Sequence, residues 1–457
     1  MLGLDRQKRH HTPVSYPKPR QIAIDVLTLS QKTKVPVESL LGNALKDAKL
    51  NPNDSNLCRE LVSGCVRWRR LLDWLINRHT KKPKQKPIIQ EILRLGLYQI
   101  FFLNRIPEHA IVNESVILAK VNNHTRQSGF INALMRRFLK EKESVFKIIS
   151  HLRDKQPALG LSHPDWLFEK WEQQWGREKA IRLLEWNNQP APTYARLNQL
   201  NKETELLIKR WKSEKVEAIP FDCDWARKGT IYQLRKHPKI ETLQSFRDGL
   251  FYIQDPSTLL SINFLKPQSG QKILDLCAAP GGKTSLIADQ INNHGEITST
   301  DIHKSRLELI QENCKRLNIT CVKIGLAEEI LTNKENFFDR VLVDAPCTNS
   351  GVIRRRLDSR WRMNLNMKKS LAETQFKLLE KASYLTKPDG LIVYSTCSIE
   401  PEENELIVNQ FLKKHPEWEL ECDRTLHPVE DHTDGAYSAR LSKNTTKNPA
   451  SSSSEQT

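Results

Sequence analysis

The sequence predicts a multidomain protein in which an all-α part precedes a small α/β module and then an α/β domain built on a parallel sheet. Three observations lead to this prediction. The 457 residues exceed what one ordinary core accommodates. Apolar residues recur at helical spacing from about residue 19 to 140. From about residue 250, apolar strands alternate with amphipathic helices, which is typical of a parallel sheet covered by helices.

The N-terminal part, placed at residues 1–145, is expected to be helical throughout. Its apolar side chains repeat at helical intervals over 22–27, 88–97 and 110–119. Pro87 and Pro107 fit helix starts or joints between helices. Basic clusters lie at 67–70, 81–86 and 136–137. Each cluster alone is typical of a solvated helix face or loop, whereas together they suit phosphate contact without readout of bases.

The rest of the chain is divided into a module at residues 151–249, a domain at 250–443 and a tail at 444–457. The module should contain a strand at 193–198 and a helix near 205–215. In the domain, strands are expected at 273–276, 296–300, 340–344 and 391–394. Helices are expected at 284–290, 304–317 and 371–385. The tail is rich in Ser, Thr and Asn and is expected to be disordered.

The chain carries a formal net charge of +17. An excess of this size favours a polyanionic partner, with nucleic acid as the leading candidate. The alternative is a basic surface that serves only solubility. No apolar run approaches the roughly 20 residues of a membrane span, and the first residues lack the apolar core of a signal peptide. We therefore expect a cytoplasmic protein with no membrane partner.

The nine cysteines include no C-x-x-C pair, so the sequence predicts free thiols and no metal site. Two of them stand out by context. Cys347 closes the segment VDAPC at 343–347, and Cys397 lies in YSTCS at 394–398. Each follows an apolar run, which places each thiol at the tip of a strand. Two such thiols suggest covalent chemistry on an electrophilic ring.

A turn of small residues follows the strand at 273–276. In a doubly wound sheet, ligands bind beyond the carboxyl ends of the strands, where small residues allow close approach and helix amides bind anions. The turn matches neither G-x-G-x-x-G nor the P-loop, whose first glycine would fall at position 277. Its expected cofactor-binding residues are Cys277, Ala278, Ala279, Pro280, Gly281, Gly282 and Lys283.

The second strand ends at Asp301, where an acidic side chain commonly accepts hydrogen bonds from ribose hydroxyls. A strand-end aspartate can also simply cap the next helix. Together with the small-residue turn, Asp301 indicates a cofactor that carries adenosine. The residues alone leave NAD and S-adenosylmethionine open.

These segments closely resemble the signature of RNA cytosine-5 methyltransferases, in the order and spacing of the Sun/Fmu/RsmB and NOL1/NOP2 group. The resemblance spans roughly 250–443 and includes flanking matches at 254–257, 351–355, 401–404 and 434–441. Residues 112–116 and 129–137 also resemble the NusB-type RNA-binding fold, which RsmB/Sun members carry ahead of the catalytic domain. The resemblance implies a NusB-like helical domain, a Rossmann-like methyltransferase domain and S-adenosylmethionine as cofactor. It further implies that the substrate is a cytosine of 16S ribosomal RNA.

Carried over residue by residue, the resemblance implies that Cys397 attacks C6 of the cytosine and that Cys347 helps to break the adduct. It implies that Asp344 contacts the cytosine or the cofactor and that Lys283 supports the site. The arginines at 354–356 could hold phosphates that flank the target base, or they could form a solvated basic turn.

The third strand end, at 323–328, lacks the aspartate that many relatives place there, so no site residue is assigned to it. Two alternatives stay open. One is cytosine-5 methylation of tRNA or another RNA, which the catalytic motifs do not distinguish. The other is a non-catalytic RNA-binding factor for ribosome assembly, although a pure binder needs neither thiol.

Overall fold

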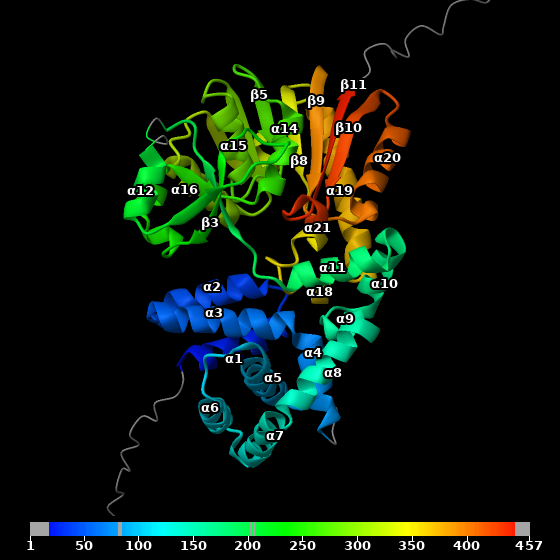
Figure 1. Cartoon of the computed structure of the whole chain (residues 1–457). Coiled ribbons are helices and arrows are strands. Elements are labelled where there is room, and N and C mark those ends of the chain that lie inside the picture. The colour runs from blue at the N-terminus through cyan, green and yellow to red at the C-terminus, as the bar shows by residue number, and fades with distance from the viewer. Residues whose placement is uncertain (1–17, 81–84, 202, 204–205, 444–457) are drawn as a thin grey trace, which may run out of the picture. The chain divides into compact units, whose positions relative to one another are not determined.

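The computed structural model describes residues 18–80, 85–201, 203 and 206–443 (Figure 1). The chain forms two compact units. The first, called the helical unit here, consists of residues 1–188 together with the short segment 356–361. The second, called the sheet unit, consists of residues 189–355 and 362–457.

Helix α5 (Pro87–Phe102) lies within the core that residues 23–159 mainly form, and it has buried residues from Ile89 to Phe101 on nearly every side. A helix buried around nearly its whole circumference lies inside a bundle, and α5 buries its polar Glu91, Arg94 and Gln99 as well. Helix α3 (Pro52–Arg67) begins where Asn51 Oδ1 accepts the Asp54 amide at 2.8 Å. The other helices are α1 (Lys18–Ser30), α2 (Val37–Ala48), α4 (Arg69–Arg78), α6 (Glu108–Val121), α7 (Ser128–Lys140), α8 (Lys142–Lys155), α9 (Pro157–Gly160), α10 (Asp165–Trp175) and α11 (Arg177–Asn188).

The predicted helical character is confirmed for the described residues of 19–140, and among the described residues helices continue to Asn188 without a strand. The division of the chain at 145, 151, 249 and 250 stays a prediction. The first break between the two compact units in the chain falls between residues 188 and 189. The predicted tail, 444–457, lies outside the described residues, as do residues 81–84 of one basic cluster. Of the other clusters, Arg136 and Arg137 are exposed on α7, but Arg67 is buried and cannot present its charge to a partner.

The segment 356–361 is the one part of the C-terminal half that belongs to the helical unit. Leu357 joins the helical core, and Trp361 Nε1 donates to the Val66 carbonyl at 2.8 Å. Arg360 is fully buried. Its guanidinium donates to the carbonyl of Asn187 at 3.0 Å and to Asn188 Oδ1 at 2.8 Å. The polar groups at the end of α11 thus accept hydrogen bonds from the buried guanidinium, whose Nε has no partner among the described residues.

We expect Arg360→Ala to lower the free energy of unfolding by about 2–3 kcal/mol, because buried acceptors lose a charged donor. Urea unfolding followed by far-ultraviolet circular dichroism measures this change. Arg356→Ala, at an exposed position of the same segment, is the matched control and should change stability little. Equal stability of the two variants would contradict the importance given to the buried guanidinium.

The sheet unit begins with a four-stranded antiparallel sheet of order β2-β3-β1-β4. Its strands are β1 (Thr193–Leu197), β2 (Glu217–Pro220), β3 (Ile231–Lys236) and β4 (Phe251–Ile253), with α12 (Leu207–Ser213) and α13 (Gln244–Arg247) between them. The strand predicted at 193–198 is confirmed. Arg196 of β1 is buried and donates to Ser285 Oγ of α15 (Gly282–Gln290) at 2.7 Å, so this small sheet packs on a helix that covers the larger sheet.

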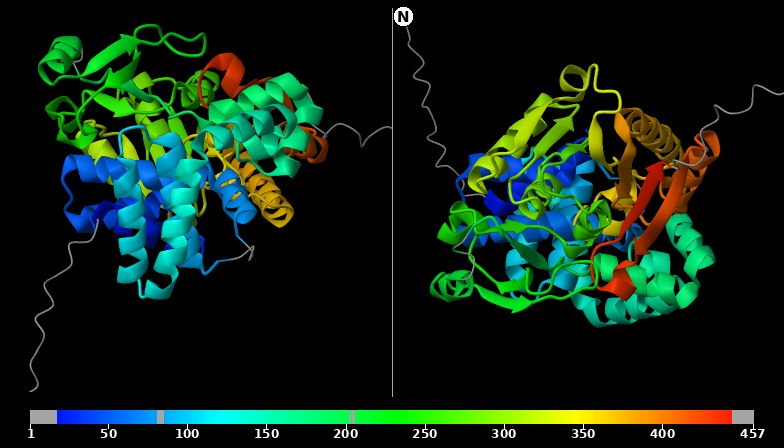
Figure 2. Two further views of the ribbon diagram at one scale, coloured as in Figure 1. Left: turned by 60° about the horizontal axis from the view of Figure 1, so that its bottom comes forward. Right: turned by 90° about the horizontal axis from the view of Figure 1, so that it is seen from above.

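The larger sheet has seven strands in the order β10-β11-β9-β8-β5-β6-β7. The strands are β5 (Lys272–Asp275), β6 (Glu296–Asp301), β7 (Val322–Leu326), β8 (Phe338–Asp344), β9 (Thr386–Thr396), β10 (Trp418–Leu426) and β11 (Ala436–Lys443). Strands β5 to β9 are parallel, as predicted. The sequence did not predict the antiparallel edge of the sheet, where β11 pairs antiparallel with both β9 and β10 (Figure 2). The connection over 427–435 holds only the short α21 (Pro428–Asp431) and is too short for a parallel crossover.

Helices cover both faces of this sheet. Alternate strand residues face opposite ways, so Ile273 and Leu342 join one core and Leu274 and Val341 join the other. Helices α14 (Leu259–Leu265), α15 (Gly282–Gln290) and α16 (Lys304–Arg316) supply the first core. Helices α17 (Ala327–Ile330), α19 (Leu365–Leu385) and α20 (Glu405–Lys414) supply the second. The result is the doubly wound arrangement in which ligands bind at the carboxyl edge of the parallel strands.

The described part of the chain contains no helix long and apolar enough to cross a membrane. Within the same residues, no group of three or more His, Cys, Asp or Glu side chains is arranged to hold a metal ion.

Candidate active site

The small-residue turn lies between the end of β5 and the start of α15. The Ala278 amide donates to the Thr300 carbonyl of β6 at 2.8 Å, and the Gly281 amide donates to the Ala278 carbonyl at 2.7 Å. Gly281 has φ +98°, a conformation that favours glycine. A Cβ atom on Gly282 would come within 2.9 Å of a ring carbon of Tyr252. The tight turn therefore requires both glycines.

Asp275 ends β5 directly below this turn and is fully buried. Its Oδ2 accepts the Thr284 hydroxyl at 2.7 Å, which joins the strand to α15. Its Oδ1 is buried without a hydrogen-bond partner among the described residues. An acceptor of this kind is one that a bound donor group can complete. Burial raises the pKa of the Asp275 carboxyl to about 7.

Asp301 stands at the end of β6 and is buried. It accepts the His303 amide at 3.0 Å and forms an ion pair with Arg306 of α16 at 3.0 Å. Arg306 also donates to the Ala279 carbonyl at 2.9 Å, so it joins Asp301 to the small-residue turn. The turn and the strand-end carboxylate predicted to bind one cofactor are thus parts of one connected structure.

The side chain of Lys283, in the first turn of α15, extends toward β8 and β9, the two strands that lead to Cys347 and Cys397. Its Nζ forms an ion pair with Asp344 at the end of β8. Ser395 of β9 donates to Asp344 Oδ1 at 3.0 Å and lies 3.4 Å from Lys283 Nζ. Asp344 and Ser395 are paired residues of the parallel strands. Lys283 therefore joins the predicted cofactor turn to the predicted catalytic strands.

The two predicted catalytic thiols are in contact. Cys347 Sγ and Cys397 Sγ lie 3.2 Å apart, although the residues are distant in sequence. Cys397 is partly accessible and donates to Asn349 Oδ1 at 3.1 Å, whereas Cys347 is buried. The hydrogen bond with Cys397, followed by burial, holds the pKa of Cys347 well above its ordinary value. Cys347 is therefore a neutral thiol near pH 7, and Cys397 is the thiol that an incoming ring can reach.

Cys277 differs from these two thiols. Burial raises its pKa to about 12, and the side chain packs against the core formed with α19 and α20. Its thiol is therefore inert near neutral pH, and a contribution to cofactor binding falls to its backbone and its small size.

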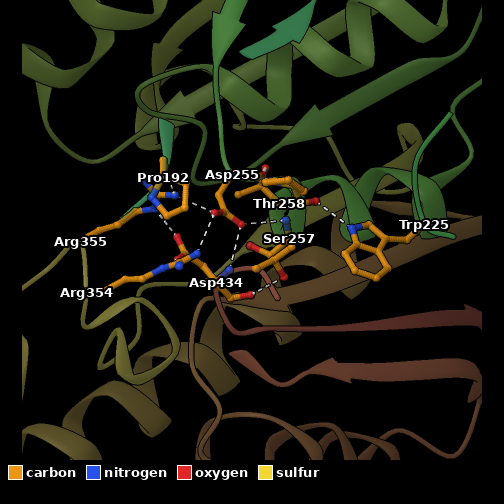
Figure 3. Close-up of polar contacts among 10 residues, drawn as sticks. Pro192, Trp225, Asp255, Ser257, Thr258, Arg354, Arg355 and Asp434 are labelled. Atoms are coloured by element: carbon orange, nitrogen blue, oxygen red, sulfur yellow. Dashed lines mark hydrogen bonds and ion pairs between the residues drawn. The ribbon is translucent and has the colours of Figure 1, made fainter. Parts of the chain in front are cut away.

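The arginines that follow the first thiol point into the protein. Arg354 Nε and Arg355 Nε donate to the two oxygens of Asp434 at 2.7 and 2.5 Å. Arg355 also donates to Asp255 Oδ2 at 2.8 Å and to the Pro192 carbonyl at 2.9 Å. Figure 3 shows these four charged side chains facing one another. Asp255 Oδ1 in turn accepts the Asp434 amide at 3.1 Å.

This network corrects the expectation for residues 354–356. Arg354 and Arg355 neither hold phosphates nor form a solvated turn, because buried aspartates neutralise them. A buried charge requires such a partner. The network instead ties the chain after Cys347 to the segment around Asp255 and to the closing segment at Asp434. Of these three arginines, Arg356 is the exposed one.

Comparison with known proteins locates three family models along the chain. Residues 262–447 match the model described as 16S rRNA methyltransferase RsmB/F, and residues 17–140 match the NusB family. Residues 163–229 match the ferredoxin-like domain of RsmF/B-like methyltransferases. The probable ribosomal RNA small subunit methyltransferase B of Bacillus subtilis (strain 168) is 33% identical, over 88% of this chain and 89% of its own length. The chain belongs to the RsmB/F family of 16S rRNA methyltransferases.

A second relative agrees with this assignment, and a solved structure has the same fold. The ribosomal RNA small subunit methyltransferase B of Klebsiella pneumoniae (strain 342) is 32% identical, over 86% of this chain and 91% of its own length. The crystal structure of PH0851 has a TM-score of 0.77 and 24% identity, covering 93% of this chain and 99% of that one, and shows the same fold. The resemblance drawn from the sequence is therefore confirmed for the RsmB/F family, the NusB-like helices and the α/β methyltransferase domain.

Sequence reasoning missed three polar residues of this RsmB/F site. Asn349 contacts Cys397 from a left-handed backbone conformation, with φ +62°. Ser395 bridges Asp344 and Lys283, and Glu403 lies buried behind the thiols. The asparagine at a turn and the match at 401–404 were the available signals. Neither signal indicates which way a side chain points.

Asp275 provides a test by pH. The folded protein holds a proton on this carboxyl up to about pH 7, whereas the unfolded chain releases it near 3.8. As the pH rises from about 4 to 7, the free energy of unfolding of the wild type should therefore fall relative to that of Asp275→Asn. Urea unfolding at several pH values measures the difference, with exposed Asp389→Asn as the matched control. If the free energies of unfolding of Asp275→Asn and the wild type change with pH in the same way, the raised pKa of Asp275 is contradicted.

Proposed function

We propose that this RsmB/F protein transfers a methyl group from S-adenosylmethionine to C5 of a cytosine in 16S ribosomal RNA through a covalent cysteine adduct. The observation that carries the proposal is the contact of Cys347 Sγ and Cys397 Sγ at 3.2 Å, beyond the ends of adjacent parallel strands. Methylation at a heteroatom of a base would need neither thiol. Methylation at C5 needs a nucleophile, and release of the product benefits from a second group beside it.

Cys397 is the proposed nucleophile. C5 of cytosine is a poor nucleophile until a thiolate adds to C6 and shifts the ring electrons toward C5. S-adenosylmethionine supplies the electrophilic methyl group when bound. A base then takes the C5 proton, and the electrons of that C–H bond restore the C5–C6 double bond and expel Cys397 as a thiolate. The Cys347 thiol lies beside the departing sulfur and assists this release. The greater accessibility of Cys397 supports its role as the attacking thiol.

The residues around the turn fit a cofactor with an adenosine and an amino acid part. The tight glycines leave room for close approach, Asp301 offers a carboxylate at the ribose position, and Asp275 has an unpartnered acceptor. The residues that would hold it are Cys277, Ala278, Ala279, Pro280, Gly281, Gly282, Lys283, Asp301 and Asp344. Asp344 and Lys283 are shared between cofactor and cytosine, since their ion pair lies beside Ser395 on the strand that leads to Cys397.

The RNA must present an unstacked cytosine, because C5 and C6 of a stacked base are out of reach of a thiol. The net charge of +17 supports binding to a polyanion, and the NusB-like helices supply a second surface for RNA. We propose that the protein acts in the cytoplasm, since ribosomal RNA is its proposed substrate.

Substitution of the two thiols should separate their roles. Cys397→Ala is expected to abolish methyl transfer, whereas Cys347→Ala should form the adduct and fail to release it. Incubation with RNA and S-adenosylmethionine, followed by a denaturing gel, detects the adduct as a shifted protein band. Cys422→Ala is the control and should retain activity, because Cys422 is an exposed cysteine of β10 that lies outside the two thiol segments. An adduct in Cys397→Ala in place of Cys347→Ala would reverse the assignment.

The substrate is identified by bisulfite sequencing of ribosomal and transfer RNA from a strain that lacks the gene. One cytosine of 16S rRNA should become fully convertible in the deletion strain and be protected again when the gene is restored. Loss of protection in transfer RNA alone would favour the alternative substrate. An unchanged pattern in all RNAs would favour a non-catalytic assembly factor.

A further inference from the structure

Behind the thiols lies a buried carboxylate that the proposed chemistry does not use. Glu403 ends the short 3-10 turn Pro401–Glu403, and only 1% of the residue is exposed. Its Oε1 accepts the backbone amide of Thr348 at 2.9 Å and lies 3.2 Å from Gln375 Nε2. Its Oε2 accepts the hydroxyls of Thr348 at 2.5 Å and of Ser398 at 2.6 Å.

The positions of these donors matter more than their number. Thr348 directly follows Cys347, and Ser398 directly follows Cys397. One carboxylate therefore holds the residues next to both thiols. Hydrogen bonds to a charged acceptor are about twice as strong as neutral ones, so this group fixes both loops firmly.

We propose that Glu403 is a positioning residue that keeps the Cys347 and Cys397 thiols in contact. The proposal deepens the proposed cytosine-5 chemistry and rests on it for its purpose. The thiol separation that it explains can nevertheless be measured without any methyl transfer.

Further bonds hold the two loops and should keep them folded without Glu403. The Gly351 amide donates to the Cys397 carbonyl at 3.1 Å and joins the loops directly, and the Gly435 amide donates to the Gly351 carbonyl at 2.8 Å and anchors the first loop to the closing segment. Gln375 Nε2 donates to the Pro346 carbonyl at 2.9 Å. These bonds fix the backbone, whereas Glu403 acts on the residues adjoining the thiols. Loss of Glu403 should therefore shift the sulfur atoms and leave the fold in place.

The charge of Glu403 has a second effect. Glu403 adds to the hydrogen bond with Cys397 and to burial in raising the pKa of Cys347. The carboxylate thus favours the neutral thiol at Cys347 while Cys397 remains the accessible thiol. Glu403 therefore positions Cys347 and Cys397 and also contributes to the raised pKa of Cys347.

Phenylarsine oxide is a suitable probe, because its arsenic exchanges oxygen for two thiol sulfurs, releases water and binds tightly only when the thiols are close together. Binding to other cysteines is measured with Cys397→Ala and subtracted, which leaves the arsenical binding that depends on the Cys347–Cys397 pair. We expect this affinity to fall at least about tenfold in Glu403→Ala and less in Glu403→Gln, which retains one acceptor oxygen. Glu402→Gln, at the exposed neighbouring position, is the matched control and should bind as the wild type does.

Kinetics provide the second readout. In Glu403→Gln, kcat for methyl transfer should fall by about 10- to 100-fold, because small misplacements of reacting groups cost this much. The KM for S-adenosylmethionine should stay within about twofold, since Glu403 lies behind the thiols and has no contact with the turn. Thermal unfolding by circular dichroism records whether stability changes as well.

Unchanged arsenical affinity and kcat in folded Glu403→Ala would overturn the proposal, even if its stability is lower. If that variant does not fold, Thr348→Val and Ser398→Ala decide the question, because each removes one donor and leaves Glu403 in place. Reduced arsenical affinity in these variants supports positioning, and wild-type affinity refutes it. Failure of the wild type to methylate any RNA would refute the proposed function and leave the arsenical result to judge Glu403.

Discussion

The active site depends on the parallel pairing of β8 with β9. This pairing sets Asp344 opposite Ser395, so that both strands end at the same edge of the sheet. The loops that carry Cys347 and Cys397 leave from these ends, and their sulfur atoms meet. Lys283 connects the same edge to the turn after β5 through its ion pair with Asp344. A slip of one residue in this register would turn the side chains to opposite faces and separate the groups.

Buried charge is the second organising feature. Asp255 and Asp434 neutralise Arg354 and Arg355 behind the chain that follows the first thiol. Glu403 takes hydrogen bonds from both thiol loops. Charged groups taken out of water lose hydration and are retained only with good partners, so such networks tolerate few alternative geometries. This intolerance suits loops that must hold two sulfur atoms at a fixed separation.

Much of this could be predicted from the sequence, for physical reasons that can be named. The strands ending at Asp275 and Asp344 contain apolar runs that are buried, and such runs are recognisable without a structure. The antiparallel edge formed by β10 and β11 was missed, since strand direction depends on connection length and on the partner chosen in space. Arg354 and Arg355 were misjudged because their aspartate partners lie far away in sequence.

The sequence by itself determined the family, the order of helices and strands, and the residue types that proposed catalysis requires. Local periodicity and short motifs encode these features, and neighbouring residues suffice to read them. Only the tertiary structure decided that the two thiols touch, that Lys283 pairs with Asp344 and that Glu403 lies behind both thiol loops. Each of these contacts joins segments that are remote in the chain. Only sheet register and the packing of buried polar groups bring such segments together.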